Sequence, residues 1–239
     1  EVQAGVSAVS AVSRQNRVFG SVLGNWRENF DSKAFDQQSL TATGGFAHSF
    51  ASRDTLSLSG QVQQFWLGHT SYRQGYGAVA QYTKLLPKGR ALSLSAQLFR
   101  FDYERDRFRD SSRLALALSY ADKNFAVTLQ GGHEETRRQA GDSNSNSFIR
   151  ANAGVELPIS KSVSFVGSAA FDLRKHDAPD ALFLKKRQEE RVDVSAGVKV
   201  LLTKNLYLRP RVSYTRNWSN IALYDHDRWT ASVGLRAEF

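Results

Sequence analysis

The last residues of the chain alternate between apolar and polar side chains, and this alternation limits the folds that the chain can adopt. Before a loop at 217–227 the apolar positions are Leu206, Leu208, Pro210, Val212 and Tyr214, and after it they are Trp229, Ala231, Val233, Leu235, Ala237 and Phe239. A period of two residues over this length indicates long β-strands with one apolar and one polar face. The sequence therefore predicts that the chain closes with a hairpin and stops on an aromatic strand residue.

The same period recurs along the chain. Apolar or small residues occupy every second position at 2–8, 40–46, 56–62, 92–98, 114–120, 163–171 and 192–200. No run approaches the roughly 20 apolar residues of a membrane-spanning helix. Half-apolar strands are nevertheless those of a transmembrane barrel, whose two faces average to a low hydropathy, and the mean hydropathy here is -0.43. The alternative, a soluble meander or sandwich, has shorter strands of about five or six residues.

Two kinds of connection alternate between the strands. Short turns lie around residues 15, 53, 88, 123, 161 and 204, and longer polar loops lie at 27–38, 67–73, 102–110, 135–147, 175–190 and 217–227. Short periplasmic turns, long extracellular loops and crossing strands of about 9 to 11 residues are the layout of an outer-membrane barrel. The predicted fold is all-β, an antiparallel up-and-down transmembrane β-barrel of the bacterial outer membrane.

The number of strands adds a prediction about the extent of the chain. We count about thirteen strands, whereas single-chain bacterial barrels have an even number, which places both termini on the periplasmic side. If Phe239 is periplasmic, the strand that begins at Val2 runs downward from the outside, and an upward first strand is missing. We therefore expect residues 1–239 to be one barrel domain, the C-terminal part of a longer chain with about 14 strands in the parent.

Charge and composition restrict the partners. Lys and Arg number 32 against 23 for Asp and Glu, and the net charge of +9 predicts attraction to anions such as lipopolysaccharide phosphates. The basic residues are scattered and form no nucleic-acid-reading motif, so we expect no nucleic-acid partner. Cysteine is absent, which removes disulfides and thiolate sites. We expect no cofactor and no metal. The expected partners are outer-membrane lipids and the barrel assembly machinery, which would recognise Phe239.

The closing hairpin resembles a known family. The segments RPRVSY at 209–214, RNWSNI at 216–221 and LYDHDR at 223–228, with the final Phe239, look like the C-terminal barrel of the surface lipoprotein assembly modifier family. The family-like residues are Asn217, Ser219, Asn220, Tyr224, Asp225, Arg228 and Phe239. The resemblance covers about the last thirty residues. Members pair a periplasmic tetratricopeptide-repeat region with a barrel of about fourteen strands. The resemblance implies lipoprotein or soluble protein cargo, moved across the outer membrane.

Charged residues on the polar faces are the candidate transport residues. They are Arg113, Arg150, Asp193, Lys199, Arg209, Arg211, Arg228 and Arg236. Charges that line a barrel can tune what passes through it. Equally, inward arginines can pair with carboxylates such as Asp172 and support the shape of the barrel, and the sequence leaves both roles open.

A catalytic site at the rim is the competing hypothesis. Asp225 and His226 could polarise water, as acidic and histidine pairs do in outer-membrane proteases. That reaction needs a second carboxylate pair across the rim, which nothing in the sequence places there. Asp225 is instead expected to organise the turn before Arg228 starts the last strand. We therefore assign no catalytic residue.

The barrel pattern and the family resemblance together imply a function in transport. We expect an outer-membrane translocon component that helps move specific surface lipoproteins or secreted proteins and has no chemistry of its own. A passive porin or an exopolysaccharide export barrel is the alternative in the same location. A rim-site hydrolase is the alternative from another class.

Overall fold

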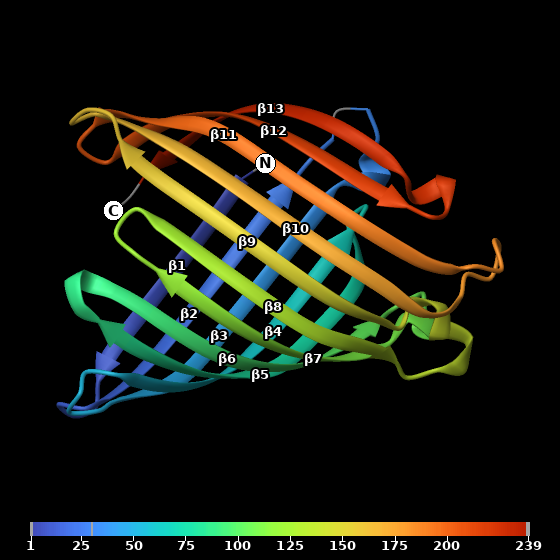
Figure 1. Ribbon diagram of the computed structural model, residues 1–239, viewed down its shortest axis with the longest axis horizontal. Helices are drawn as coiled ribbons and strands as arrows, with labels where there is room; N and C mark the ends of the chain where they lie inside the picture. The colour runs from blue at the N-terminus through green and yellow to red at the C-terminus, as the bar shows by residue number, and fades with distance from the viewer. Residues whose placement is uncertain (1, 30, 238–239) are drawn as a thin grey trace. The chain divides into compact units, whose positions relative to one another are not determined.

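A computed structural model describes residues 2–29 and 31–237, and most of these residues lie in antiparallel β-strands (Figure 1). Within these ranges thirteen strands form one sheet, and their order in the sheet is their order in the sequence. The strands are β1 (Val2–Ala11), β2 (Asn16–Arg27), β3 (Gln37–Ser49), β4 (Thr55–Leu67), β5 (Thr70–Leu86), β6 (Arg90–Tyr103), β7 (Ser111–Ala121), β8 (Phe125–Thr136), β9 (Asn146–Pro158), β10 (Val163–Pro179), β11 (Lys186–Thr203), β12 (Leu206–Ser219) and β13 (His226–Ala237). The prediction of an antiparallel up-and-down β fold of the barrel type is confirmed.

Short 3-10 turns complete the described secondary structure. They are η1 (Lys33–Phe35), η2 (Pro87–Gly89), η3 (Arg107–Arg109), η4 (Gln139–Asn144) and η5 (Ala222–Tyr224). None of the helices in the described ranges is long and apolar enough to cross a membrane. Phe239, which we expect the assembly machinery to read, lies outside the described residues.

The chain divides into two compact units. The N-terminal unit contains the residues up to Leu85 together with Ser93–Leu116 and Gly132–Asn146. The C-terminal unit contains Leu86–Leu92, Ala117–Gly131 and the residues from Ser147 onward. Strands β1 to β4 therefore belong to the N-terminal unit, and β10 to β13 belong to the C-terminal unit.

The register gathers apolar side chains on one face of the N-terminal unit. Phe46 of β3 lies opposite Val18 of β2 and Leu58 of β4, and Leu58 lies opposite Ala80 of β5. Residues that pair across antiparallel strands point to the same face. Leu58 and Val62 keep 57% and 58% of their surface exposed. This apolar, exposed surface is what a lipid-facing sheet presents.

Aromatic rings fill the opposite face of the same unit. Phe99 and Phe101 of β6 are buried, and their rings are stacked with centroids 6.1 Å apart. Glycines on β5 leave room for them. A Cβ at Gly77 would lie 2.6 Å from the Phe99 ring and 2.3 Å from the carbonyl oxygen of Leu98, and a Cβ at Gly75 would lie 3.0 Å from the Phe101 ring. The core of this unit therefore depends on the absence of side chains at two strand positions.

The strands run further than the apolar alternation predicted, so some loops are shorter. The loop expected at 67–73 is a tight turn at Gly68 and His69, whose φ angles are 57° and 64°. The loop expected at 175–190 narrows to the residues between Pro179 and Lys186. Backbone hydrogen bonds do not require apolar side chains, so pairing continues where the apolar alternation has ended.

Polar contacts order the longer connections of the N-terminal unit. Asp36, which is 1% exposed, accepts a hydrogen bond from the backbone N–H of Asn29 at 2.7 Å and lies 3.1 Å from the ring of His69. The bond from Asn29 holds the pKa of Asp36 below its usual range. A Cβ at Gly141 in η4 would lie 1.7 Å from the carbonyl oxygen of Phe108, so η3 and η4 are in direct contact.

A single carboxylate shapes the tip of the β10–β11 hairpin. Asp180 accepts hydrogen bonds from the backbone N–H groups of Leu182 and Phe183 at 2.9 and 3.2 Å, and from the hydroxyl of Tyr224 at 3.2 Å. These bonds, first the one from Leu182, lower the pKa of Asp180. The turn that they hold leaves Leu182 and Leu184 exposed at 77% and 80%.

Candidate functional site

The polar face of the C-terminal unit carries rows of residues paired across β10 to β13, which we call the polar ladder. One row is Asp172, Arg191, Asn217 and His226; the next is Ala170, Asp193, Thr215 and Arg228; then come Ser168, Ser195, Ser213 and Thr230, followed by Val166, Gly197, Arg211 and Ser232. Because side chains alternate along a strand, all of these residues lie on one face. The predicted residues Asp193, Arg211 and Arg228 therefore share this face, with Asp193 and Arg228 in one row and Arg211 two rows away.

Ion pairs offset part of the positive charge at the first two rows. Arg150 of β9 pairs closely with Asp172, and the guanidinium of Arg174 lies 3.5 Å from the same carboxylate. Arg191 donates two hydrogen bonds of 2.8 Å to Asp193. The side chains of Arg191 and Asp193 are 46% and 37% exposed, and such pairs each contribute only about 0–1 kcal/mol to stability. Their main effect is to present alternating charges without a large net charge.

Arg211 reaches across a glycine to two serine hydroxyls. Its guanidinium donates hydrogen bonds to Ser168 at 2.9 Å and to Ser195 at 2.5 Å, and these two hydroxyls lie 2.7 Å apart. Gly197 lies opposite Arg211 in the register, and a Cβ there would lie 2.4 Å from the carbonyl oxygen of Pro210 and 3.1 Å from Cα of Arg211. The close approach of β11 and β12 at this point therefore requires glycine.

A polar hollow of about 510 Å³ lies over the charged rows. Its lining residues are Gln130, Arg150, Asn152, Ala170, Phe171, Asp172, Arg174, Glu189, Arg191, Asp193, Asn217 and His226. These residues combine guanidinium, carboxylate and amide groups, which can hydrogen-bond to a peptide backbone or to a sugar. The hollow is therefore lined mainly by polar and charged side chains.

The remaining predicted charges of the C-terminal unit lie further along the strands. Lys199 lies 3.2 Å from the carboxylate of Glu156, and its ammonium stands 4.6 Å from the centre of the Tyr207 ring. Arg209 precedes Arg211 by two residues and so shares its face. Arg236 lies opposite Tyr207 in the register. These residues extend the polar face beyond the hollow.

Arg113 belongs to the N-terminal unit and packs on its aromatic face. Its guanidinium carbon is 5.6 Å from the ring centre of Phe99 and 5.0 Å from that of Phe101. Arg73 lies 4.8 Å from the Phe101 ring centre. Guanidiniums at these distances are attracted to the faces of aromatic rings. For Arg113 the contacts favour the structural role over the transport role.

The similarity of the chain to known proteins extends far beyond its closing hairpin. Residues 19–239 match the family model described as surface lipoprotein assembly modifier. The chain belongs to this family. A solved structure from a study of the in-meso crystallization of membrane proteins is similar with a TM-score of 0.52 and 14% identity, over 91% of this chain and 81% of that one. At this identity the likeness is one of fold alone. No curated protein matches the chain.

Five of the residues that resemble the assembly modifier family, Asn217, Ser219, Asn220, Tyr224 and Asp225, lie in or beside the turn between β12 and β13. Asn217 is buried and donates a 2.6 Å hydrogen bond to the carbonyl oxygen of Tyr224. Asn220 accepts a hydrogen bond from the backbone N–H of Gln188 at 2.9 Å and donates one to the carbonyl oxygen of Lys186 at 2.8 Å. The second asparagine therefore ties the closing hairpin to the β10–β11 hairpin.

The rim residues considered for catalysis also act within this turn. Asp225 forms an ion pair of 2.7 Å with Arg216 and accepts a hydrogen bond from the backbone N–H of Ser219 at 3.4 Å. Nδ1 of His226 lies 3.1 Å from the carbonyl oxygen of Tyr224. Ser219 in turn accepts a hydrogen bond from the backbone N–H of Ile221 at 3.2 Å. This arrangement is the turn-organising role that the sequence predicted for Asp225.

Sequence reasoning missed several residues on the polar face that carries the ladder in this assembly modifier barrel. On β11, Arg187, Glu189, Arg191, Asp193 and Ser195 share one face because they are spaced by two residues. Of these only Asp193 was predicted as a site residue. The signal was present, since charges of alternating sign at every second position mark a polar strand face that is not simply solvated. The same signal was present on β10, where Arg174 follows Asp172 by two residues.

Proposed function

We propose that this chain is the barrel domain of an outer-membrane translocon component, and that it helps move specific surface lipoproteins or secreted proteins across the outer membrane. The observation that carries the proposal is the match to the surface lipoprotein assembly modifier family over residues 19–239. The barrel-type fold supports an outer-membrane location. In this proposal the polar ladder faces the lumen and the apolar face contacts lipid.

The ion pairs along the ladder support a conduit for polypeptide. A surface dominated by arginine would retain acidic cargo, because each unpaired charge would form a new ion pair with it. Here Arg150 and Arg191 are already paired with Asp172 and Asp193. Side chains in such pairs exchange partners at low cost when they are partly exposed. A segment of cargo can therefore slide along the ladder without being trapped.

Arg211→Gln is the variant that separates transport from structure. Ser168 and Ser195 remain hydrogen-bonded to each other when the guanidinium is removed, so we expect the barrel to fold. We expect surface display of a cognate lipoprotein, measured by antibody labelling of intact cells, to fall several-fold. Lys161→Gln, in an exposed short turn, is the matched control for the loss of one positive charge and should leave display unchanged.

The amount of folded barrel in the outer membrane is measured in parallel by its heat-dependent gel mobility. Normal display on complete deletion of the protein would refute the translocon. Normal display with Arg211→Gln would refute only the role of the ladder.

Bilayer conductance separates this proposal from a passive porin. We expect the purified protein to give no steady conductance to small ions in the absence of cargo, whereas a porin conducts continuously. Asp225 has a structural role in our proposal, so Asp225→Asn should abolish no hydrolytic activity. Steady conductance, together with normal lipoprotein display in a deletion strain, would favour the porin.

A further inference from the structure

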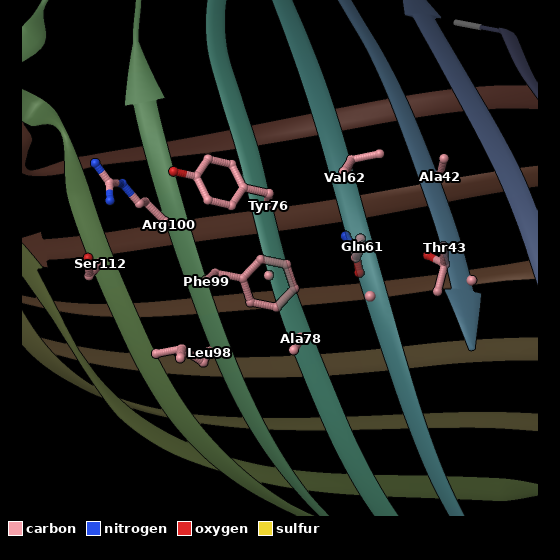
Figure 2. A pocket seen from close by; sticks show the side chains of 13 residues that line it. Ala42, Thr43, Gln61, Val62, Tyr76, Ala78, Leu98, Phe99, Arg100 and Ser112 are labelled. Carbon is pink, nitrogen blue, oxygen red and sulfur yellow. The ribbon is translucent and has the colours of Figure 1, made fainter. Parts of the chain in front are cut away.

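The apolar face of the N-terminal unit is hollowed, and Figure 2 gives a close view of this part. The hollow has a volume of about 820 Å³. The small residues Ala42, Gly44, Gly60 and Ala78 line it. The larger side chains of Val62, Tyr76 and Leu98 also line it (Figure 2). Val62 and Tyr76 are 58% and 43% exposed, as expected of side chains on the apolar face. We call this site the outer hollow.

The floor of the hollow is a row of small residues paired across three strands. Gly44 of β3 lies opposite Gly60 of β4, which lies opposite Ala78 of β5. A Cβ at Gly44 would meet nothing within 4 Å, and one at Gly60 would meet only the carbonyl oxygen of Gly77, at 3.9 Å. These glycines are therefore not required by packing within the protein, in contrast to Gly77 on the opposite face.

The outer hollow continues along the strands into a second depression of about 550 Å³. Both depressions are lined by Gly60, Ala78 and Leu98, and the second adds Leu58, Ala80, Ala96 and Leu114. The result is an elongated apolar trough. Its shape fits a flexible hydrocarbon chain better than a compact molecule.

A positively charged side chain, that of Arg100, lies at one end of this trough. Arg100 and Ser112 line the outer hollow beyond Leu98, and the side chain of Arg100 is 48% exposed. The guanidinium lies 3.7 Å from Asp102, but the same carboxylate also pairs closely with Arg137. Arg137 also lies 3.5 Å from Asp110, whose carboxylate is 3.9 Å from Arg138. Three guanidiniums thus share two carboxylates, which leaves an excess of positive charge next to the apolar trough.

From this arrangement we infer that the outer hollow binds a phosphate-bearing acyl lipid. An acyl chain lies in the trough over Gly60 and Ala78, and the phosphate pairs with Arg100. The charge excess at Arg100 is what selects an anionic headgroup. Lipid tails are as apolar as the protein surface, so the trough selects by close packing and not by the hydrophobic effect. The inference rests on the proposed outer-membrane location.

The test is native mass spectrometry of the purified full-length protein in detergent. The probes are lipid A with its phosphates, the same lipid A without phosphates, and a synthetic triacylated lipopeptide. We expect the phosphorylated lipid to be retained about tenfold more strongly than the dephosphorylated one, as for the loss of one charge-assisted contact.

Gly60→Leu fills the centre of the trough and should reduce retention of lipid A about tenfold. Its control is Gly131→Leu on β8, because Gly131 lies on the same strand face as Leu129 and outside both depressions. A Cβ at Gly131 would meet the Phe148 carbonyl oxygen at 3.8 Å. Arg100→Gln should bring retention of phosphorylated lipid A down to that of the dephosphorylated form. Arg90 lies on the same face of β6 as Arg100, at the other end of the strand. Arg90→Gln is therefore the control for the loss of one positive charge.

Equal retention by Gly60→Leu and Gly131→Leu would overturn the trough as the binding site. Unchanged retention by Arg100→Gln would overturn phosphate recognition. Tighter binding of the triacylated lipopeptide than of lipid A would also overturn the inference, and would assign the trough to the anchor of a lipoprotein cargo. No cargo is present in this measurement, so its failure is distinguishable from a failure of lipoprotein display.

Discussion

Two adjacent glycines on β3 should respond in opposite ways to the same substitution. Gly44 and Gly45 point to opposite faces of the strand. A Cβ at Gly45 would lie 2.6 Å from the carbonyl oxygen of Leu58, 2.6 Å from the ring of Phe19 and 2.8 Å from Cβ of Ser59, whereas a Cβ at Gly44 would meet nothing within 4 Å. We predict that Gly45→Ala destabilises the protein and that Gly44→Ala does not.

The magnitude follows from two opposing effects. Overpacking costs about 1–3 kcal/mol, and the contact with the backbone oxygen of Leu58 cannot be relieved by a change of rotamer. Replacing glycine by alanine also gains about 0.4–1 kcal/mol by restricting the unfolded chain. Gly45→Ala should therefore lower the free energy of unfolding by about 1–2 kcal/mol, and Gly44→Ala should raise it by about 0.5 kcal/mol. The two variants should differ by about 2 kcal/mol, or about thirtyfold in the unfolding equilibrium constant.

Urea unfolding of the protein in phospholipid vesicles measures this difference through tryptophan fluorescence, since the chain has 4 tryptophans. The slope of the free energy against urea concentration should be the same for both variants, because they expose the same surface on unfolding. Equal free energies of unfolding for the two variants would refute the reasoning from close contacts.

Three further predictions concern the connections between strands. Asn217→Ala should lower the free energy of unfolding by about 1–2 kcal/mol, because it removes a buried hydrogen bond, whereas Asn205→Ala in an exposed turn should have no effect in the same assay. The ionised carboxylate of Asp180 stabilises the hairpin tip at pH values above the usual pKa of aspartate, because its own pKa is lowered in the folded protein. This stabilisation is lost as the pH falls through the lowered pKa. Amide exchange at Leu182 should therefore increase, relative to intrinsic exchange, below that pH in the native protein but show no such transition in Asp180→Asn; identical profiles would contradict this. Gly141→Ala should separate η3 from η4 and increase protease cleavage in these segments. If cleavage were the same as in the control Gly154→Ala, the contact between η3 and η4 would not depend on Gly141.

The fold was predictable because one physical rule governs most of it. Alternation of apolar and polar residues determines where a strand that separates lipid from a polar interior can lie, and it located the strands that carry Leu58, Leu116 and Val194. The rule fails where a strand leaves the apolar band. Residues 70–73 continue β5 through backbone pairing and polar contacts such as those of Ser71 with Gln64 and Arg73 with Gln63, without apolar alternation, so the sequence indicated a loop where the structure has a strand.

The candidate site was predictable only in part. Period and charge identified Arg150, Asp193 and Arg211 on polar faces, but the register between strands decides which of them meet. A shift of two residues in the β11–β12 pairing that placed Arg211 opposite Lys199 would keep every side chain on its face and still separate Arg211 from Ser195. The outer hollow was not predictable, because a glycine required by packing and a glycine above open space are identical in sequence.

The hairpin tip held by Asp180 has a consequence for how quickly partners can associate. Hydrogen bonds from Leu182, Phe183 and Tyr224 to Asp180 already order its backbone. The exposed side chains of Leu182 and Leu184 are therefore held in place before any partner binds. Binding of a partner to this ordered tip costs little conformational entropy of the loop, unlike binding to a flexible loop that must first fold. Encounters at this tip are therefore limited by collision and orientation, and not by a folding step in the loop.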